Sequence, residues 1–101
     1  MNDICTDIRP MVLLSIQRAL LGEVFPSLRG VSVGWNETGI RIVCYVDGPV
    51  SSADLERLSS VETEVMADFS ENFRVNLEIV RCDAPSEMRA LTAWAYRRWE
   101  P

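Results

Sequence analysis

The chain has 101 residues, of which 48% are hydrophobic and 25% are charged, so its composition is that of one soluble globular domain and excludes a disordered chain. The net charge is −5, all ten basic residues are Arg, and there is no His, which removes the imidazole that general bases and metal sites most often use. An acidic chain is a poor electrostatic match for a phosphate backbone, so a basic protein is the better partner.

The cysteines Cys5, Cys44 and Cys82 are scattered and form no CxxC pair. This pattern predicts free thiols in a reducing cytoplasm, rather than a disulfide framework or a zinc site. The N-terminus is acidic and lacks the basic region and apolar run of a signal peptide, and no apolar stretch is long enough to span a bilayer. We therefore expect a cytoplasmic protein with no metal, no cofactor and no membrane partner.

Residues 7 to 23 are predicted to form a first helix. Asp7 can cap its start, and Pro10 is tolerated in a first turn. Gly22 and Pro26 are expected to end it. Its buried stripe is predicted to comprise Leu13, Ile16, Leu20 and Val24, widened by Leu14 and Leu21.

Two strands, residues 29 to 35 and 40 to 46, are expected to pair as a hairpin because apolar and polar residues alternate in the first and Ile40, Ile42, Cys44 and Val46 share a face in the second. The loop between them ends in Gly39, for which we expect a positive φ. The second strand also carries Val43 and Tyr45 on its other face, which indicates a central position or a covered second face.

A second helix is predicted from Ser51, its cap, to about Phe69, and a third strand from Phe73 to Ile79. A last helix should start near Asp83 or Ser86. The apolar arc of the second helix is predicted to hold Leu55, Leu58, Val61, Val65, Met66 and Phe69, and the last helix to carry Met88, Leu91, Trp94, Ala95 and Trp99.

These elements predict one α+β domain over residues 1–101, in the order α-β-β-α-β-α. We expect a small three-stranded sheet with the helices packed mainly on one face. A crossover from the second strand can place the third strand beside the first, so the predicted strand order is second, first, third.

The negative charge is concentrated in residues 52 to 72, which alone sum to −5 because one basic residue, Arg57, stands among the acidic residues Asp54, Glu56, Glu62, Glu64, Asp68 and Glu71. One interpretation is a solvated helix face. The other is an interaction surface, since Glu64, Asp68 and Glu71 repeat on one side of the helix with no Lys or Arg between them. A surface built only for solubility normally combines positive and negative charges.

Glu62 falls inside the apolar arc of the second helix, where a carboxylate must be paired, lie at the rim or have a raised pKa. Its head group could reach water or an Arg at the rim, or it could face a groove that a partner fills. An enzyme would require Glu62 in a deep pocket with a second carboxylate nearby. The sequence contains no Gly-rich phosphate loop and no nucleophile pair, so we predict no enzymatic activity and no catalytic residues.

The C-terminal run from Trp94 to Trp99 interleaves aromatic and basic side chains, which can stack on bases. We favour a different interpretation, in which the two Trp residues lie at the core and its rim and Arg97 and Arg98 satisfy a helix C-terminus. Nucleic-acid binding is not expected of an acidic chain.

A resemblance covers most of the chain and rests on three stretches: IRPMVLLSIQRALLGEVFPSLRGVSVGW, DGPVSSADLERLSSVETEVMADF and VRCDAP…WAYRR. The chain resembles immunity proteins of contact-dependent growth inhibition and related polymorphic toxin systems. The resemblance implies a cytoplasmic antitoxin that binds its cognate toxin domain, often a basic nuclease, and has no catalytic residues of its own.

Under this hypothesis the acidic helix would occupy the basic cleft of the toxin as a phosphate mimic. The predicted partner-binding residues are Glu56, Glu62, Glu64, Asp68 and Glu71, in a monomer or weak dimer. The alternative is a small αβ interaction module or homodimer of another cellular role, which associates through the first helix or through the Val43 and Tyr45 face.

Overall fold

The computed structural model describes residues 8–101. The expected cap Asp7 and the thiol of Cys5 lie outside these residues. The elements are α1 (Arg9–Leu20), β1 (Leu28–Trp35), β2 (Gly39–Val46), α2 (Ser52–Ala67), β3 (Arg74–Arg81) and β4 (Ala93–Arg97). The α+β class is confirmed, but the order is α-β-β-α-β-β, so the predicted third helix is wrong.

The sheet has four strands in the order β3-β2-β1-β4, and not three. β1 is antiparallel to both β2 and β4, and β2 is parallel to β3 with α2 as the crossover. The predicted strand order, with β3 beside β1, is therefore wrong. The edge of β1 that the prediction assigned to β3 is taken by β4, and β3 pairs instead with its predecessor β2 through the usual short β-α-β connection.

The C-terminal segment forms a strand because it pairs with the edge of β1, and both of its faces are half-buried. The hydroxyl of Ser32 in β1 donates to the carbonyl of Ala93 at 2.9 Å and accepts from the amide of Leu91 at 2.7 Å. Trp94 then contacts Tyr45, with ring centroids 6.3 Å apart. A partner strand with its own side-chain anchor thus overrides the local helical spacing, as aromatic residues in a half-buried strand favour.

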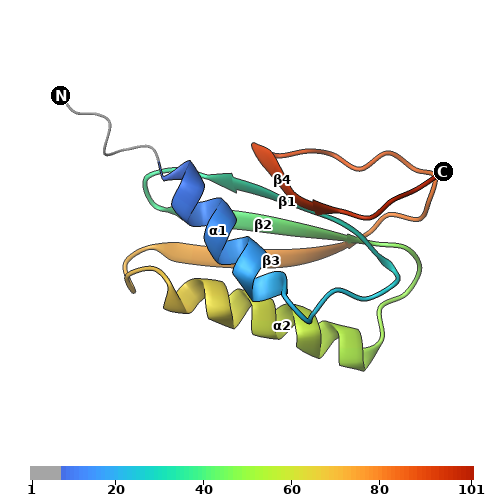
Figure 1. The fold of residues 1–101 in the computed structure, drawn as a ribbon, viewed down its shortest axis with the longest axis horizontal. Helices are drawn as coiled ribbons and strands as arrows, with labels where there is room; N and C mark the ends of the chain where they lie inside the picture. The colour runs from blue at the N-terminus through green and yellow to red at the C-terminus, as the bar shows by residue number, and fades with distance from the viewer. Residues whose placement is uncertain (1–7) are drawn as a thin grey trace.

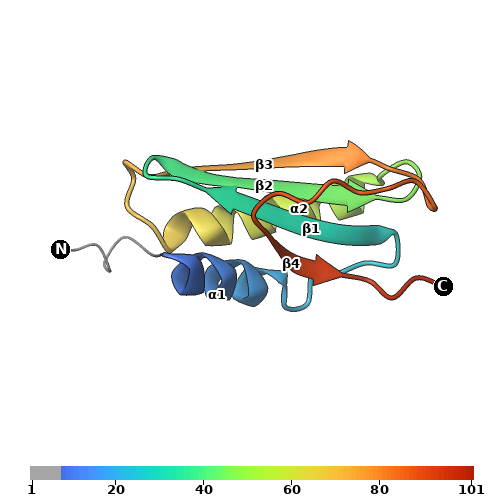
Figure 2. The same ribbon diagram turned by 90° about the horizontal axis from the view of Figure 1, so that it is seen from above.

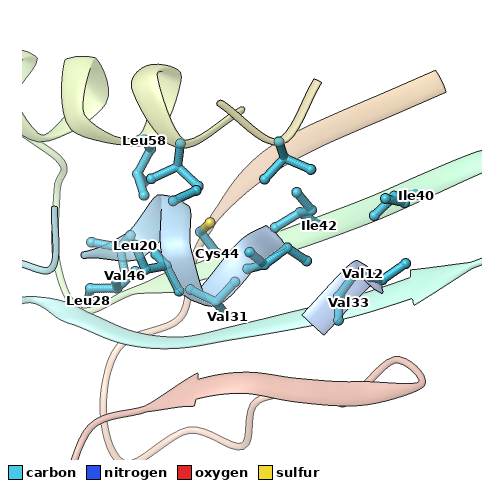
Figure 3. Close-up of a cluster of buried hydrophobic side chains, with 14 of the residues drawn as sticks. Val12, Leu20, Leu28, Val31, Val33, Ile40, Ile42, Cys44, Val46 and Leu58 are labelled. Carbon is cyan, nitrogen blue, oxygen red and sulfur yellow. The ribbon is translucent and has the colours of Figure 1, made fainter. Parts of the chain in front are cut away.

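Both helices lie on one face of the sheet, as predicted (Figures 1 and 2). The core fills the space between them and the sheet (Figure 3). Every second residue of the central strands points into it, including Val31 and Val33 from β1 and Ile42 and Cys44 from β2. Burial raises the pKa of the Cys44 thiol to about 12, with a smaller contribution from the charge of Glu62, so this thiol is inert.

α1 begins with Pro10 in its first turn and ends before Gly22, which has a positive φ of 80°, as the sequence indicated. Ile16 and Leu20 are buried. The predicted widening of its buried stripe is wrong, because Leu14 is 57% exposed and Leu21 is 76% exposed. Val24, beyond the end of the helix, is also exposed. One side of a short helix meets the sheet, and the other side faces solvent.

The hairpin between β1 and β2 forms as expected, but Gly39 does not have a positive φ. The side-chain oxygen Oδ1 of Asn36 instead accepts from the amides of Thr38 and Gly39, at 2.8 and 3.1 Å, and closes the loop. Glycine is needed at position 39 for another reason, since a Cβ there would collide with the backbone carbonyl of Arg74. This close approach brings the start of β3 against β2.

α2 begins after its predicted cap, since the hydroxyl of Ser51 accepts from the amide of Asp54 at 3.1 Å. Leu58, Val61 and Val65 are buried as predicted. Two other members of the predicted arc are not buried: Leu55 is 44% exposed and Met66 is 52% exposed. The apolar arc of α2 is therefore wider than the surface that the protein's own sheet covers.

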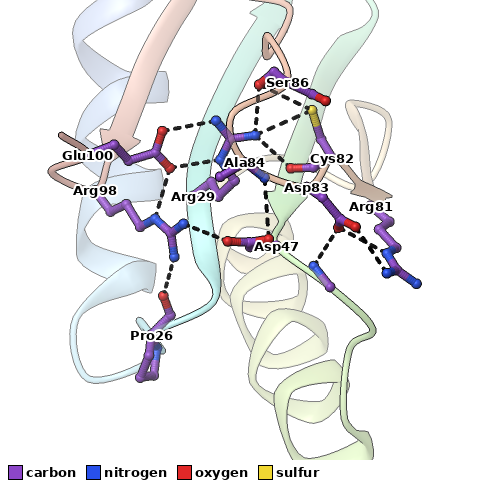
Figure 4. A network of polar contacts seen from close by, with 11 residues as sticks. Pro26, Arg29, Asp47, Arg81, Cys82, Asp83, Ala84, Ser86, Arg98 and Glu100 are labelled. Atoms are coloured by element: carbon purple, nitrogen blue, oxygen red, sulfur yellow. Dashed lines mark hydrogen bonds and ion pairs between the residues drawn. The ribbon is translucent and has the colours of Figure 1, made fainter.

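A polar network fastens the C-terminus to the start of β1 (Figure 4). The guanidinium of Arg29, a residue only 3% exposed, donates to both carboxylate oxygens of Glu100, at 2.7 and 2.9 Å. It also donates to the backbone carbonyls of Cys82 and Ser86, at 2.6 and 2.9 Å. Arg98 extends the network by donating to Glu100 and to Asp47. The predicted role of Arg98 at a helix C-terminus is thus replaced by a role in this network.

The network predicts how the stability depends on pH. The hydrogen bond from Arg29, with help from Arg98, lowers the pKa of Glu100 to about 2 from an ordinary 4.5. A carboxyl group whose pKa is lowered by folding stabilises the fold above its unfolded pKa, and this contribution is lost as the pH falls through the folded pKa. The free energy of unfolding should therefore be level above about pH 5 and fall towards about pH 2, as measured by urea unfolding at a series of pH values.

A Glu100→Gln variant separates this contribution from those of other carboxyl groups. We expect it to be less stable than the unsubstituted protein at neutral pH, and to lose less stability between about pH 5 and about pH 2. The pKa of Asp83 is also lowered, chiefly by the hydrogen bond from Arg81, so some acid sensitivity should remain. An acid dependence identical to that of the unsubstituted protein would show that Glu100 makes no such contribution.

Candidate functional site

α2 and the turn after it carry all five residues that the sequence predicts for partner binding, but the structure does not bring the five together. With 100° between successive residues, and the buried line of Leu58 and Val65 taken as the inner side, they point in three directions. Glu62 faces β3, Glu56 faces away from the sheet, and Asp68 and Glu64 lie on the side of α1, with Glu64 the more outward of the two. Glu71 follows in the turn that leads to β3.

Asp68 is neutralised by the protein itself. Its carboxylate oxygen Oδ2 accepts from the hydroxyl of Ser15 at 2.6 Å and from the guanidinium of Arg18 at 2.9 Å, and both partners lie on α1. The Ser15 hydrogen bond, followed by that of Arg18, lowers the pKa of Asp68. This carboxylate therefore joins the two helices and offers little charge to a partner.

Glu62 is half-buried and separate from the other four residues. Its carboxylate oxygen Oε2 accepts from the backbone amide of Leu77 in β3 at 2.9 Å. The expectation of a rim position is correct for its exposure, although its partner is a backbone amide and not an Arg. Its hydrogen-bond partner is thus the backbone of a strand edge, and not a second carboxylate.

Glu56, Glu64 and Glu71 are exposed, and none of them makes an ion pair with a described residue. Nearby Arg57 is engaged by Asp54 and Glu23, at 3.5 and 3.9 Å. Most carboxylates elsewhere in the described chain are paired with Arg. The described carboxylates without an ion pair are Glu37, Glu56, Glu62, Glu64, Glu71 and Glu87. Unpaired negative charge is thus concentrated on α2 and its exit.

The helical layer also exposes apolar side chains of α1 and of its C-terminal cap, and the sequence interpretation missed these exposed side chains. Leu14 and Leu21 point away from the sheet, on the same side of the helical layer as Glu56 and Glu64. Between the helices is a hollow of about 220 Å³, lined by Met11, Leu14, Ser15, Arg18, Asp68 and Phe69. The signal was present in the sequence, since α1 is apolar on both sides and its own sheet can cover only one.

We call this surface the helical face and define it by Met11 and Leu14 on α1, Leu21 at the C-terminal cap of α1, Glu56 and Glu64 on α2, and Glu71 in the turn after α2. It combines unpaired carboxylates with exposed large apolar side chains. A single exposed Leu is ordinary, whereas several on one helix beside unpaired charge are typical of a binding surface. The arrangement can recognise a partner by charge and apolar contact.

The alternative self-association face is not available. Val43 and Tyr45 are buried, because residues 84–92 cross this side of the sheet between β3 and β4. The hydroxyl of Tyr45 donates to the carbonyl of Arg89 at 2.7 Å. Both alternatives given for strand 40 to 46 are confirmed, since β2 is central in the sheet and its second face is covered. A homodimer that associates through this face is therefore not supported.

The aromatic and basic C-terminal run is split between two environments. Trp94 is half-buried, and the guanidinium of Arg97 stacks on its ring, with 5.0 Å between Cζ and the ring centroid. Trp99 is largely exposed, so its predicted place at the core or its rim is wrong. Neither helix of the described chain has the length and apolar character that crossing a membrane requires. No cluster of potential metal ligands occurs within residues 8–101.

Comparison with known proteins finds one family match. A family model described as MafI2 immunity protein matches residues 9–100, which is nearly the whole chain. None of the curated proteins matches it significantly. The resemblance to immunity proteins of toxin systems is therefore confirmed, and the family is specified as MafI2.

Proposed function

Because the chain belongs to the MafI2 immunity protein family, we propose that it neutralises a nuclease toxin by placing the helical face over the toxin's basic, nucleic-acid-binding cleft. The toxin-neutralising role follows from the family. The class of toxin and the surface that meets it are the proposed parts. Both depend on the unpaired carboxylates that gather on α2 and its exit.

A nuclease must hold a phosphate backbone, so its substrate cleft carries Lys and Arg side chains. The carboxylates of Glu56, Glu64 and Glu71 are exposed and make no ion pair with described residues, so a basic cleft would meet them without having to break internal pairs. Opposite fields accelerate the encounter of two proteins, while buried apolar contacts supply most of the affinity. Leu14 and Met11 are the exposed apolar side chains best placed to supply such contacts.

In this proposal the protein acts by steric and electrostatic occlusion and has no reaction of its own. It would meet its toxin in the cytoplasm, where the thiols of Cys44 and Cys82 remain unpaired as they are in the structure. It would bind as a monomer or weak dimer, since the face of β2 that a symmetric dimer could have used is covered.

The proposal is tested with the cognate toxin domain, purified and assayed for cleavage of DNA and of RNA. We expect cleavage of one of these substrates, and its complete loss when this chain is added in equimolar amount. A toxin that the chain neutralises, but that cleaves neither nucleic acid, would overturn the nuclease assignment. If the toxin still cleaved nucleic acid while bound to this chain, the proposed occlusion of its cleft would be overturned.

A further inference from the structure

The outer edge of β3 has backbone groups that pair with no strand within residues 8–101. The amide of Arg74 donates to Thr38 and that of Cys82 donates to the carbonyl of Val46, so the even-numbered amides between them face β2. The alternate residues Val75, Leu77, Ile79 and Arg81 therefore direct their amides and carbonyls outward. The pairing with β2 continues over all eight residues of β3, without a bulge to disrupt this edge.

α2 runs alongside this edge in the direction opposite to β3 (Figure 1). The hydrogen bond from Leu77 to Glu62 fixes their alignment. Four residues along a helix cover about 6 Å, and two residues along a strand cover about 6.6 Å, so Met66 lies beside Val75, and Leu55 lies near the other end of the strand. Met66 and Leu55 are the two members of the apolar arc that the protein's own sheet leaves half-exposed.

The inward side chains of the edge strand are incompletely covered as well. Val75, Leu77 and Ile79 point towards the helices and pack against the core, yet each is only half-buried. Between Met66 and Leu55, Glu62 uses Oε2 for the amide of Leu77, while its Oε1 has no hydrogen-bond partner among the described residues. The edge therefore presents, in sequence, an apolar position, a carboxylate and a second apolar position.

We propose that an extended strand of the toxin adds to the outer edge of β3. Its inward side chains would include an Arg or Lys on Glu62, an apolar residue two positions away on Met66, and a second apolar residue about four positions away on the opposite side, towards Leu55. At present Oε2 of Glu62 accepts the hydrogen bond from the amide of Leu77 that a carbonyl of the added strand would accept. The proposal rests on the proposed function for the identity of the partner, but it concerns a different side of α2.

A second copy of this chain is the poorer occupant. In an antiparallel pair of β3 strands centred on Leu77, both Glu62 carboxylates would approach the same amide pair, with no cation between them. The nearest Arg on the inward side of the strand is Arg81, which already pairs with Asp83 at 3.0 Å. A foreign strand that brings its own cation removes this repulsion.

Hydrogen exchange tests strand addition directly, because only alternate amides should respond. In the complex of this chain with the toxin domain that it neutralises, the amides of Val75, Ile79 and Arg81 should exchange at least about tenfold more slowly than in the free chain. The amides of Asn76, Glu78 and Val80 already face β2, so their exchange should change little. A neutralised toxin that leaves Val75, Ile79 and Arg81 unprotected overturns strand addition and leaves the proposed function standing.

A Glu62→Gln variant tests the cation, since glutamine keeps an acceptor for Leu77 and loses the charge. We expect about tenfold weaker binding of the toxin domain with little change in melting temperature. The matched control is Glu37→Gln, an exposed carboxylate away from α2 without an ion pair in the described chain, which should bind normally. Equal affinity of both variants overturns the charge pairing. If the outward amides of β3 became protected when this chain alone was concentrated, the edge would be assigned to a second copy. If the chain neutralised no toxin, both proposals would be overturned.

Discussion

An Arg29→Met variant should lose about 3 kcal/mol of unfolding free energy, which for a chain of this size corresponds to a fall of roughly 10 to 20 °C in melting temperature. Methionine fills much of the same volume but donates no hydrogen bond. The substitution removes the donor from two backbone carbonyls and leaves the carboxylate of Glu100 with Arg98 alone, inside a network that excludes most solvent. Urea unfolding at neutral pH measures the loss.

Arg41→Met is the matched control for this variant. Arg41 also lies on a central strand and donates to a carboxylate, that of Glu78, at 2.7 Å. Its side chain is 58% exposed, so the pair should contribute no more than about 0.5 kcal/mol. Equal losses of stability in the two variants would show that burial of the guanidinium does not explain the effect of Arg29. The pairing of β4 with β1 alone would then hold the C-terminus.

The importance of Arg29 could not be recognised from the sequence. In the chain it is one Arg in an alternating strand, and its partner Glu100 lies 71 residues away. The same distance explains the error at the C-terminus. The spacing of Met88, Leu91 and Ala95 suits a helix locally, whereas the edge of β1 and the hydroxyl of Ser32, which decide the outcome, are far away in sequence.

Elements whose pattern is local were predictable. The hairpin strands, the Ser51 cap of α2 and the alternation of β3 follow from residues within a few positions of one another. Strand order depends on which edges remain free after pairing, and no local period contains that information. The burial of Ile16 and Leu58 on one side of each helix was predictable. The width of the buried side was not, since that width depends on where the sheet ends.

The acidic segment shows the same division. Composition located the charge on α2, and the structure then separated its carboxylates by their partners on other elements. Ser15 and Arg18 of α1 remove Asp68 from the predicted set, and the amide of Leu77 engages Glu62. A charge-reversal experiment that included Asp68 would disrupt the contact between the two helices and confuse a folding defect with a binding defect.

The second large effect is therefore expected from a Glu64→Arg/Glu71→Arg variant, which changes exposed carboxylates without an ion pair in the described chain. Its association rate with the neutralised toxin domain should fall at least about tenfold at low salt, and the rate should lose most of its dependence on salt concentration. The physical reason is that the local field facing the basic cleft is reversed while the core is untouched. Stopped-flow association at several salt concentrations gives both quantities.

The matched control is Glu37→Arg/Glu87→Arg, which changes two exposed carboxylates away from α2 that likewise lack an ion pair in the described chain. Each Glu→Arg change adds two positive charges, so both double variants move the net charge from −5 to −1. Equal slowing of both variants would mean that the overall charge steers the encounter. Normal association of the Glu64 and Glu71 variant would show that the toxin does not approach the helical face. Slowing of that variant alone would locate the approach on this face, because the two proteins differ only in where the charge was changed.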